Sequence, residues 1–249
     1  MHDYSDLPSM QLVPLADWHD GSCGTNHTFI NSLVAYCLAN EDCYAVGVGD
    51  LAENATRTSV GAGFFEENVH IQDQMDNLYE LLAPLAATGR LWGLEEGNHC
   101  FRTTALLGLH PMKIVADRLG VPFLGYTSYH LVKVGMQQYR VFVGHNAGGG
   151  GRTMAAKSRA AENPKDVADC DIYITGHTHF LGHHRATHFE FDEDNLVMRE
   201  RMRYFVSCGS ALNYFNSYAE MSILPPLSIG APLMVFKGGP QWGIRIIDD

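Results

Sequence analysis

Several features that would indicate a particular class of protein are absent from the chain. It contains no run of about 18 apolar residues, so we expect no transmembrane helix. Residues 1–6 are acidic and do not lead into an apolar stretch, so we expect no secretory signal peptide. No internal repeat or low-complexity segment is present. These absences favour an ordinary soluble, globular protein.

Basic residues are scarce, and the cysteines are not paired in the sequence. Only 17 Lys and Arg stand against 28 Asp and Glu, which gives a formal net charge of −11. Sequence-independent binding of nucleic acid depends on Lys and Arg that neutralise phosphates, so a small anionic substrate is favoured over a long polymer. The six cysteines form no C-x-x-C pair, and a chain of 249 residues needs no disulfide staples. We therefore expect a reducing, cytoplasmic setting.

The pattern of apolar residues predicts an α/β fold in a single domain over residues 1–249. The predicted helices cover residues 26–39, 64–85 with an end near Pro84, 111–119 and 153–161. The predicted strands cover residues 12–16, 44–48, 91–94, 141–143, 172–174, 188–191, 197–206, 233–236 and 243–247. Strands and helices that alternate first, followed by strands alone, indicate sheet layers flanked by helices.

Metal-binding residue types occur in five short patches, each directly after a strand-like run. The patches are Asp17-Trp18-His19, Gly49-Asp50, Gly97-Asn98-His99, Gly144-His145 and Gly176-His177-Thr178-His179. Any one of these histidines alone would more often be an ordinary core or surface residue, and the two aspartates could cap a helix or form a turn. In open α/β sheets, however, ligands bind beyond the carboxyl ends of the strands. The shared placement therefore favours one common site.

The patches together offer two Asp, one Asn and five His, with no thiolate among them. Hard oxygen ligands mixed with imidazoles suit a pair of divalent cations better than a structural zinc ion. Two such ions about 3.5–4 Å apart form a hydrolytic centre for phosphate esters. The sequence therefore predicts a metal-dependent phosphoesterase.

The order of the patches resembles the signature of the calcineurin-like metallophosphoesterase superfamily. That signature runs D-x-H, G-D-x-x-[DE], G-N-H-[DE], a His after a strand, and G-H-x-H, and the chain follows it in order across residues 17–179. The resemblance implies a β-sandwich of two mixed sheets flanked by helices, in a four-layer α/β/β/α arrangement. The C-terminal strands without helices fit the second sheet.

The resemblance also implies a role for each matched residue. The first metal ion would be bound by Asp17, His19, Asp50 and His179, and the second by Asp50, Asn98, His145 and His177. Asp50 would bridge the two ions, and manganese, iron and zinc all suit these ligands. A metal-bound hydroxide would attack phosphorus in line, opposite the leaving oxygen. Asn98 and His99 would contact the substrate, with His99 as a general acid or as a donor to the developing charge.

One departure from the signature concerns His99. The superfamily usually has an acid after G-N-H, whereas this chain has Cys100. Because that acid commonly supports the neighbouring histidine, the orientation and pKa of His99 are open. Glu53 is a carboxylate close to the same loops and could compensate for the missing acid.

Two arginines outside the signature are candidates for contact with the substrate. Arg102 could neutralise a second phosphate or pair with an acid. The glycine tract 148–151 with Arg152 could wrap a phosphate with backbone N–H groups, or could be a flexible loop near the site. The tract does not match G-x-x-x-x-G-K-[ST], so it is not a P-loop.

Histidines and aromatic residues elsewhere also have two interpretations each. His27 could touch the substrate, although a surface position at a helix start is favoured. Tyr214, Phe215 and Tyr218 could stack on a base, although packing under the C-terminal sheet is favoured. A solvated loop is favoured over extra metal binding for the histidines that follow the last patch, which are His183, His184 and His188.

The expected activity is hydrolysis of phosphodiesters or small nucleotide-like phosphoesters. A DNA or RNA nuclease is the alternative, but it would need a basic groove, and the chain has no clear basic run. Phosphomonoesterase and protein phosphatase activity are open, whereas a non-catalytic metal-binding module is disfavoured because every expected ligand is present. The segments 207–210, 218–220 and 225–227 resemble a tail of phage and prophage members of the superfamily, which would place the protein in a host cytoplasm.

Overall fold

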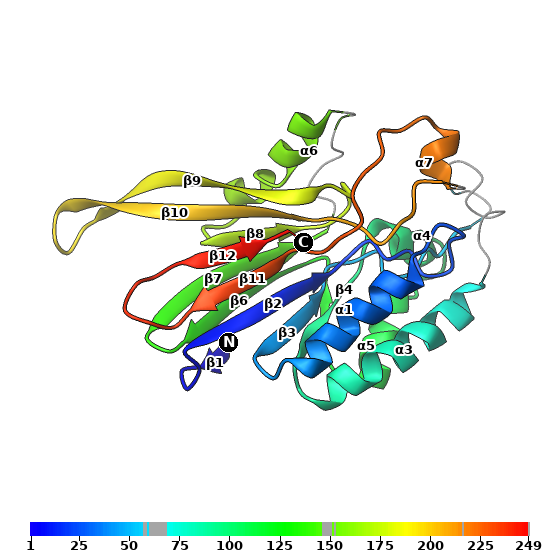
Figure 1. Cartoon of the computed structure of the whole chain (residues 1–249), viewed down its shortest axis with the longest axis horizontal. Coiled ribbons are helices and arrows are strands. Elements are labelled where there is room, and N and C mark those ends of the chain that lie inside the picture. Colours follow the sequence, from blue (N-terminus) through cyan, green and yellow to red (C-terminus); the bar gives the residue numbers. More distant parts are fainter. Residues whose placement is uncertain (57–58, 60–68, 146–150, 152, 216, 249) are drawn as a thin grey trace.

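Two six-stranded mixed sheets form the centre of the computed structural model, which describes residues 1–56, 59, 69–145, 151, 153–215 and 217–248 (Figure 1). The first sheet has the order β12-β11-β2-β3-β4-β5. Its strands are β2 (Ser9–Leu15), β3 (Cys43–Gly47), β4 (Leu91–Glu95), β5 (Phe123–Gly125), β11 (Leu233–Lys237) and β12 (Ile244–Ile247).

The second sheet has the order β1-β6-β7-β8-β10-β9. Its strands are β1 (His2–Tyr4), β6 (Thr127–Val134), β7 (Gln137–Gly144), β8 (Ile172–Thr175), β9 (Leu181–Asp192) and β10 (Val197–Cys208).

Helices lie on the outer faces of both sheets, so the predicted class of two mixed sheets flanked by helices is confirmed. The first sheet is covered by α1 (His27–Ala39), α3 (Ile71–Ala87) and α5 (Pro111–Leu119), with α4 (Asn98–Leu107) after β4. The second sheet is covered by α6 (Met154–Ala160) and the 3-10 helix Asn163–Asp166. A short helix, α7 (Tyr218–Met221), lies in the segment between β10 and β11. In the described part of the chain, no helix is long and apolar enough to cross a membrane.

Strand β2 shows why the sheets have apolar side chains on both faces. Successive side chains of a strand point to opposite faces. Met10 and Leu12 belong to the core between the two sheets, whereas Val13 and Leu15 belong to the core between the first sheet and its helices. A central strand that is buried on both faces has a continuous apolar sequence rather than an alternating one.

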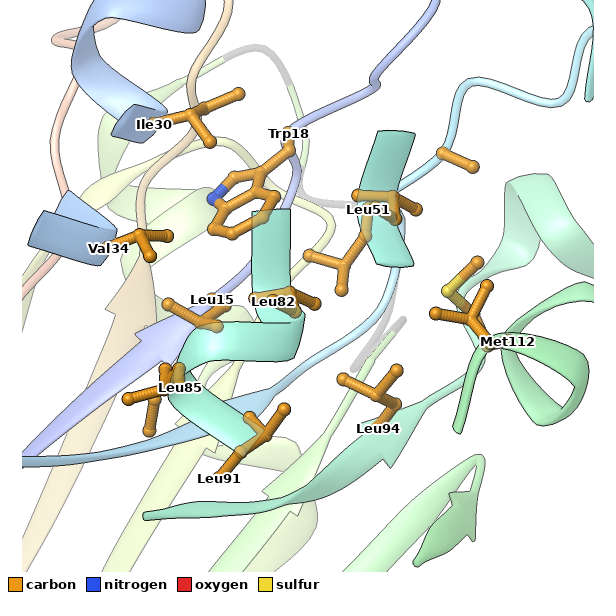
Figure 2. Close-up of a cluster of buried hydrophobic side chains, with 14 of the residues drawn as sticks. Leu15, Trp18, Ile30, Val34, Leu51, Leu82, Leu85, Leu91, Leu94 and Met112 are labelled. Carbon is orange, nitrogen blue, oxygen red and sulfur yellow. The ribbon is translucent and has the colours of Figure 1, made fainter. Parts of the chain in front are cut away.

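The apolar residues Trp18 and Leu51 anchor two of the candidate ligand loops (Figure 2). Trp18 is 1% exposed and shares the helix-side core with Ile30. Leu51 is fully buried in the same core. Because Trp18 follows Asp17 and Leu51 follows Asp50, these buried side chains hold the loops that carry both carboxylates.

The mutation Trp18→Ala is expected to lower the free energy of unfolding by about 3–5 kcal/mol, because it leaves a cavity in the core. It should also weaken metal binding, since the loop that carries Asp17 and His19 loses its anchor. Denaturant unfolding of the chelated protein measures the first effect, and titration with Mn²⁺ measures the second. Trp18→Phe refills most of the cavity and is the milder control. A loss of less than about 1 kcal/mol in Trp18→Ala would contradict the anchoring role.

The helices predicted at residues 26–39, 111–119 and 153–161 are confirmed as α1, α5 and α6. The helix predicted at 64–85 is confirmed as α3, and residues 64–68 lie outside the described part of the chain. Its expected end near Pro84 is wrong, because α3 continues to Ala87. Leu82 and Leu85 are fully buried, and their packing holds the last turn together although Pro84 donates no backbone hydrogen bond.

Several elements are not evident from the apolar pattern, namely β1, β5, β6, α4, α7 and the 3-10 helix. In α4 the only buried residue is Cys100, while Leu106 and Leu107 are exposed, so the helix shows no apolar stripe that faces the core. Two of the histidines that follow the last patch also differ from expectation. His183 and His184 lie in β9, which pairs with β10 along its whole length, and not in a loop. His188 lies in the same strand, in agreement with the strand predicted over residues 188–191.

Candidate metal centre

Five strand ends meet at one end of the sandwich. In the first sheet β2, β3 and β4 are parallel neighbours, and in the second sheet β7 and β8 are parallel neighbours. Ligand sites form beyond the carboxyl ends of such strands, and the loops that follow them gather at the right-hand end of Figure 1. These loops and the start of α4 carry eight of the predicted site residues, which are Asp17, His19, Asp50, Asn98, His99, His145, His177 and His179.

Asp17, His19 and His179 form the first ligand group. Nε2 of His19 lies 3.1 Å from Nε2 of His179 and 3.8 Å from Oδ1 of Asp17. Nε2 of His179 lies 3.3 Å from the same Asp17 oxygen. Ligand atoms about 2.1 Å from a common ion are separated by roughly 3–4 Å, so these three atoms have the spacing of ligands to one ion.

Asp50, His145 and His177 form the second ligand group, with Asn98 beside it. Nε2 of His145 lies 3.0 Å from Oδ2 of Asp50 and 3.1 Å from Oδ1 of Asn98. The same nitrogen lies 4.0 Å from Oδ1 of Asp17, so the two groups are directly adjacent. Residues that follow strands of both sheets thus lie together, and each group is made of residues that the resemblance assigns to one ion.

Hydrogen bonds on the far side of the ring orient two of these histidines. Nδ1 of His145 lies 2.8 Å from the backbone carbonyl of Val48, so Nδ1 carries a proton and Nε2 is directed toward Asp50. Nδ1 of His19 lies 2.9 Å from Oε2 of Glu53 in the same way. Metal-binding histidines are commonly held by such contacts, which fix both the tautomer and the direction of the ring.

The backbone of the ligand loops adopts a conformation that residues with a side chain rarely take. Eight non-glycine residues in the described part of the chain have a positive φ, and five of them are candidate ligands. These five are Asp17, His19, Asp50, His177 and His179. Each such residue costs about 1–3 kcal/mol, and strain of this kind clusters at functional sites.

Glycines beside the ligands allow the loops to approach one another. A Cβ atom on Gly97 would lie 2.0 Å from Oδ1 of Asp50, and one on Gly176 would lie 2.6 Å from Nδ1 of His145. Any other residue at these two positions would push the ligands apart. This close approach explains why a glycine precedes the ligands in these patches.

The charges of the cluster stabilise one another. Burial raises the pKa of Asp50, but His145 and His99 outweigh this effect and hold that pKa well below its usual value. Burial lowers the pKa of His145, but Asp50 and Asp17 outweigh it and raise that pKa to about 9. An ion that binds at neutral pH must therefore displace a proton from His145, which couples metal binding to proton release.

Glu53 lies next to His99, whereas Cys100 does not support it. Nδ1 of His99 lies 2.9 Å from the backbone carbonyl of Glu53 and 3.4 Å from its Oε2. Burial lowers the pKa of His99, but Asp50 and Glu53 outweigh it, and the net shift is upward. Cys100 is fully buried in the helix-side core. A third group of close donor atoms consists of His19, Glu53 and His99. The hydrogen bonds between Glu53 and the two histidines already account for the spacing of this group.

Of the other residues that were predicted to contact the substrate, only some lie at the site. Arg102 lines the cavity beside the ligands, with NH1 3.8 Å from Oε1 of Glu53, as in the ion-pair interpretation. Arg152 and residues 146–150 lie outside the described part of the chain, so the phosphate-wrapping loop stays a prediction. His27 lines a different cavity, where it pairs with Asp20 at 3.7 Å.

A cavity of about 440 Å³ opens onto the candidate ligands, and two parts of its wall are not evident from the sequence. The first is Lys157 in α6, whose Nζ donates a hydrogen bond to the backbone carbonyl of Thr178 at 2.6 Å. The second is the segment 210–227, which brings Tyr214 to the cavity. Its aromatic residues were the only sequence signal for this wall. Phe215 is exposed and does not pack under the C-terminal sheet, whereas the side chain of Tyr218 lies outside the described part of the chain.

A buried carboxyl lies behind the ligands, at the end of β4. Glu95 is fully buried and accepts a hydrogen bond from Oγ of Ser128 at 2.7 Å. Its Oε2 has no hydrogen-bond partner in the described part of the chain. Burial raises the pKa of Glu95 to about 8. The folded metal-free protein therefore holds a proton at Glu95 at neutral pH, whereas the unfolded chain does not.

The contribution of Glu95 to the stability of the metal-free protein is expected to fall as pH rises. The pKa of Glu95 is raised from 4.5 to about 8 in the folded state, so its contribution is fully present below 4.5 and is lost as pH rises through 8. Glu95→Gln stays neutral at every pH and should be more stable than the wild type by up to about 4 kcal/mol near neutral pH, and equal to it in acid. Denaturant unfolding of chelated protein across this range measures the difference.

The matched control is Glu96→Gln, the same change one residue further along. Glu96 is also buried, but its carboxylate is ion-paired with His110 at 2.9 Å and accepts a hydrogen bond from Thr104. This variant should be less stable than the wild type at neutral pH. A parallel pH dependence in the wild type and in Glu95→Gln would show that Glu95 is not the group responsible.

Solved phosphoesterase structures are among those that the chain resembles. A predicted phosphoesterase from Streptococcus pneumoniae matches 97% of this chain and 98% of its own, with a TM-score of 0.38 and 8% identity. Haemophilus influenzae NAD nucleotidase (NadN) matches 96% of this chain and 49% of its own, with a TM-score of 0.43 and 10% identity. The calcineurin-like phosphoesterase YfkN from Bacillus subtilis matches 96% and 90%, with a TM-score of 0.41 and 11% identity.

No protein-family model matches the chain, and no curated protein matches it. The structural likenesses have TM-scores of 0.38–0.43, so they carry no weight for the family or for the activity. The function has to be inferred from the side chains of the site.

Proposed function

We propose that the chain is a calcineurin-like, metal-dependent phosphoesterase that binds two divalent ions. The observation that carries this proposal is the pair of adjacent ligand groups at the ends of strands from two different sheets. In each group the ligand atoms lie within 4.8 Å of one another. The ligands would be Asp17, His19, Asp50, Asn98, His145, His177 and His179. Manganese, iron or zinc would suit them, and phosphodiesters or small nucleotide-like phosphoesters are the favoured substrates.

The donor set fits divalent ions by its chemistry. The Nε2 atoms of His19 and His179 are 3.1 Å apart, and two imidazole lone pairs at this distance repel each other unless a proton or a cation lies between them. Asp17 and Asp50 are buried, and in the described part of the chain histidines are their only ion-pair partners. When bound, two divalent ions supply Lewis acidity and an activated water.

Side chains around the ligands would bind the phosphate and move a proton. His99 lines the cavity, and its raised pKa favours the protonated ring that a proton donor to the leaving oxygen requires. Lys157 lines the same cavity with its Nζ bound to a neutral carbonyl, and no carboxylate lies within 4.0 Å of it in the described part of the chain. Its charge can therefore pair with a phosphate oxygen, while Arg102 already shares its charge with Glu53.

A small substrate is favoured over nucleic acid. The cavity of about 440 Å³ is within the range of small-molecule sites. The net charge of −11 gives the chain no general attraction for a polyanion. A non-catalytic module that only binds metal is the second candidate, and the count of bound ions together with turnover separates the two.

The first experiment compares bis-p-nitrophenyl phosphate with p-nitrophenyl phosphate, after chelation and readdition of manganese, zinc or iron. We expect metal-restored turnover of the diester and close to two ions per chain by elemental analysis. Turnover of the monoester alone would change the assignment to a phosphomonoesterase. Bound metal without turnover of either ester would favour the binding module. Absence of both metal binding and turnover would overturn the proposal.

A further inference from the structure

We propose that the segment between β10 and β11 forms a subsite for a flat aromatic group, such as a nucleobase, and that this group stacks on Tyr214. The inference rests on the proposed phosphoesterase function and names the substrate class of that site. Tyr214 lines the same cavity as His19 and Asp50. A phosphoester bound at the ligand groups would therefore place its organic part along this wall.

The segment is closed at its base as a single loop. The backbone N–H of Gly230 donates a hydrogen bond to the carbonyl of Ser210 at 3.2 Å, so the chain leaves and returns at one place. A Cβ atom on Gly209 would lie 2.4 Å from the carbonyl oxygen of Gly230, so the closure requires glycine there. In Figure 1 the loop, drawn in orange and containing α7, lies at the end of the sandwich where the ligand loops gather.

Backbone hydrogen bonds tie the start of the loop to the first ligand loop. The N–H of Ala211 donates to the carbonyl of Asp17 at 3.1 Å. Two residues later, the N–H of Asn213 donates to the carbonyl of Gly24 at 2.8 Å. Tyr214 follows directly, so the position of its ring is coupled to that of the first ligand group. A subsite needs such a link, because the stacked group and the reacting phosphate belong to one molecule.

The wall that the loop provides is largely apolar. Tyr214 shares it with Leu212, Leu224, Pro225 and Leu227. No charged side chain of segment 210–227 lines the cavity in the described part of the chain. This wall is suited to an uncharged, flat group and unsuited to a second phosphate. Stacking on an aromatic side chain is favourable for every base, since each base has a π-face.

The positive charges of the cavity come from other elements. Arg102 belongs to α4 and Lys157 to α6, and both line the cavity together with the candidate metal ligands. The cavity therefore combines a charged, metal-binding part with an apolar, aromatic part. This combination matches a molecule that carries a phosphate on one side and an uncharged base on the other.

The test uses two substrate pairs, each with a shared reacting group: the first pair differs in a whole nucleoside, and the second differs in the base alone. The p-nitrophenyl ester of thymidine 5′-phosphate is compared with methyl p-nitrophenyl phosphate, and AMP is compared with ribose 5-phosphate. We expect the wild type to prefer the base-carrying partner in kcat/KM by about tenfold or more. Tyr214→Ala should lose most of this preference through slower turnover of the base-carrying partner. Tyr214→Phe keeps the ring and should keep the preference.

Phe191→Ala is the control, because Phe191 is an aromatic residue of β9, is 54% exposed and is not among the residues that line the cavity. It should leave the preference unchanged. Calorimetric binding of AMP and ribose 5-phosphate gives a second readout that does not require turnover, and Tyr214→Ala should weaken AMP binding alone.

The outcomes separate the subsite from the activity. No preference in the wild type, or an unchanged preference in Tyr214→Ala, would overturn the subsite even if base-free esters are hydrolysed with metal. Absence of metal-dependent turnover for every ester would overturn the proposed function. In that case calorimetry still decides on the subsite, since equal binding of AMP and ribose 5-phosphate would reject it.

Discussion

Asp50→Asn is expected to lower kcat/KM for phosphoesters by about 10³-fold or more and to reduce the number of bound ions. Oδ2 of Asp50 lies 3.0 Å from Nε2 of His145, and its Oδ1 accepts a hydrogen bond from the backbone N–H of His99 at 2.9 Å. The mutation removes a negative charge from the middle of the ligand cluster while it keeps the shape of the side chain. Steady-state kinetics and elemental analysis after readdition of manganese measure both effects.

The matched control is Asp20→Asn, the same change at a buried carboxyl outside the ligand groups. Asp20 accepts a hydrogen bond from Asn77 at 3.2 Å and lines the other cavity, and burial raises its pKa, so a neutral side chain is tolerated there. This variant should keep its metal content and most of its activity. Two ions per chain and near-normal turnover in Asp50→Asn would reject the bridging role.

The candidate ligands could be predicted from the sequence because each one follows an apolar run within a few residues. The end of a parallel strand fixes where the next residues lie, so five strand ends indicate one site before any side-chain position is known. The glycines beside the ligands are a second sequence signal for the same site. Gly97 and Gly176 mark loops that pass too close to Asp50 and His145 for any side chain.

The walls of the cavity could not be predicted in the same way. Lys157 is an ordinary residue of α6 in the sequence, and its place at the site is evident only from the cavity and from its hydrogen bond to the carbonyl of Thr178. Tyr214 is placed at the cavity by its neighbour Asn213, whose backbone N–H donates a hydrogen bond to the carbonyl of Gly24, far earlier in the sequence. Such long-range backbone pairing leaves no local pattern. Helix α4 was hidden for a different reason, because exposed apolar residues blur its amphipathic period.

His99→Ala is expected to lower kcat by about 10²–10⁴-fold while both ions stay bound. His99 belongs to neither of the two ligand groups, and its Nδ1 is held by the backbone carbonyl of Glu53. The pKa of His99 is raised by Asp50 and Glu53, which outweigh burial, so the wild type should lose activity on the alkaline side as this ring loses its proton. The pH profile of kcat in His99→Ala should lack that alkaline decline.

The leaving group distinguishes the two roles that His99 can have. A general acid protonates the leaving oxygen, so its loss should harm an alkyl ester, which has a poor leaving group, far more than a p-nitrophenyl ester. A donor to the charge that develops on phosphate would be needed equally for both esters. Loss of one bound ion in His99→Ala would instead make His99 a ligand, together with His19 and Glu53 in the third group of close donor atoms. Full kcat for both esters would exclude either catalytic role, because the ring would then take no part in the reaction.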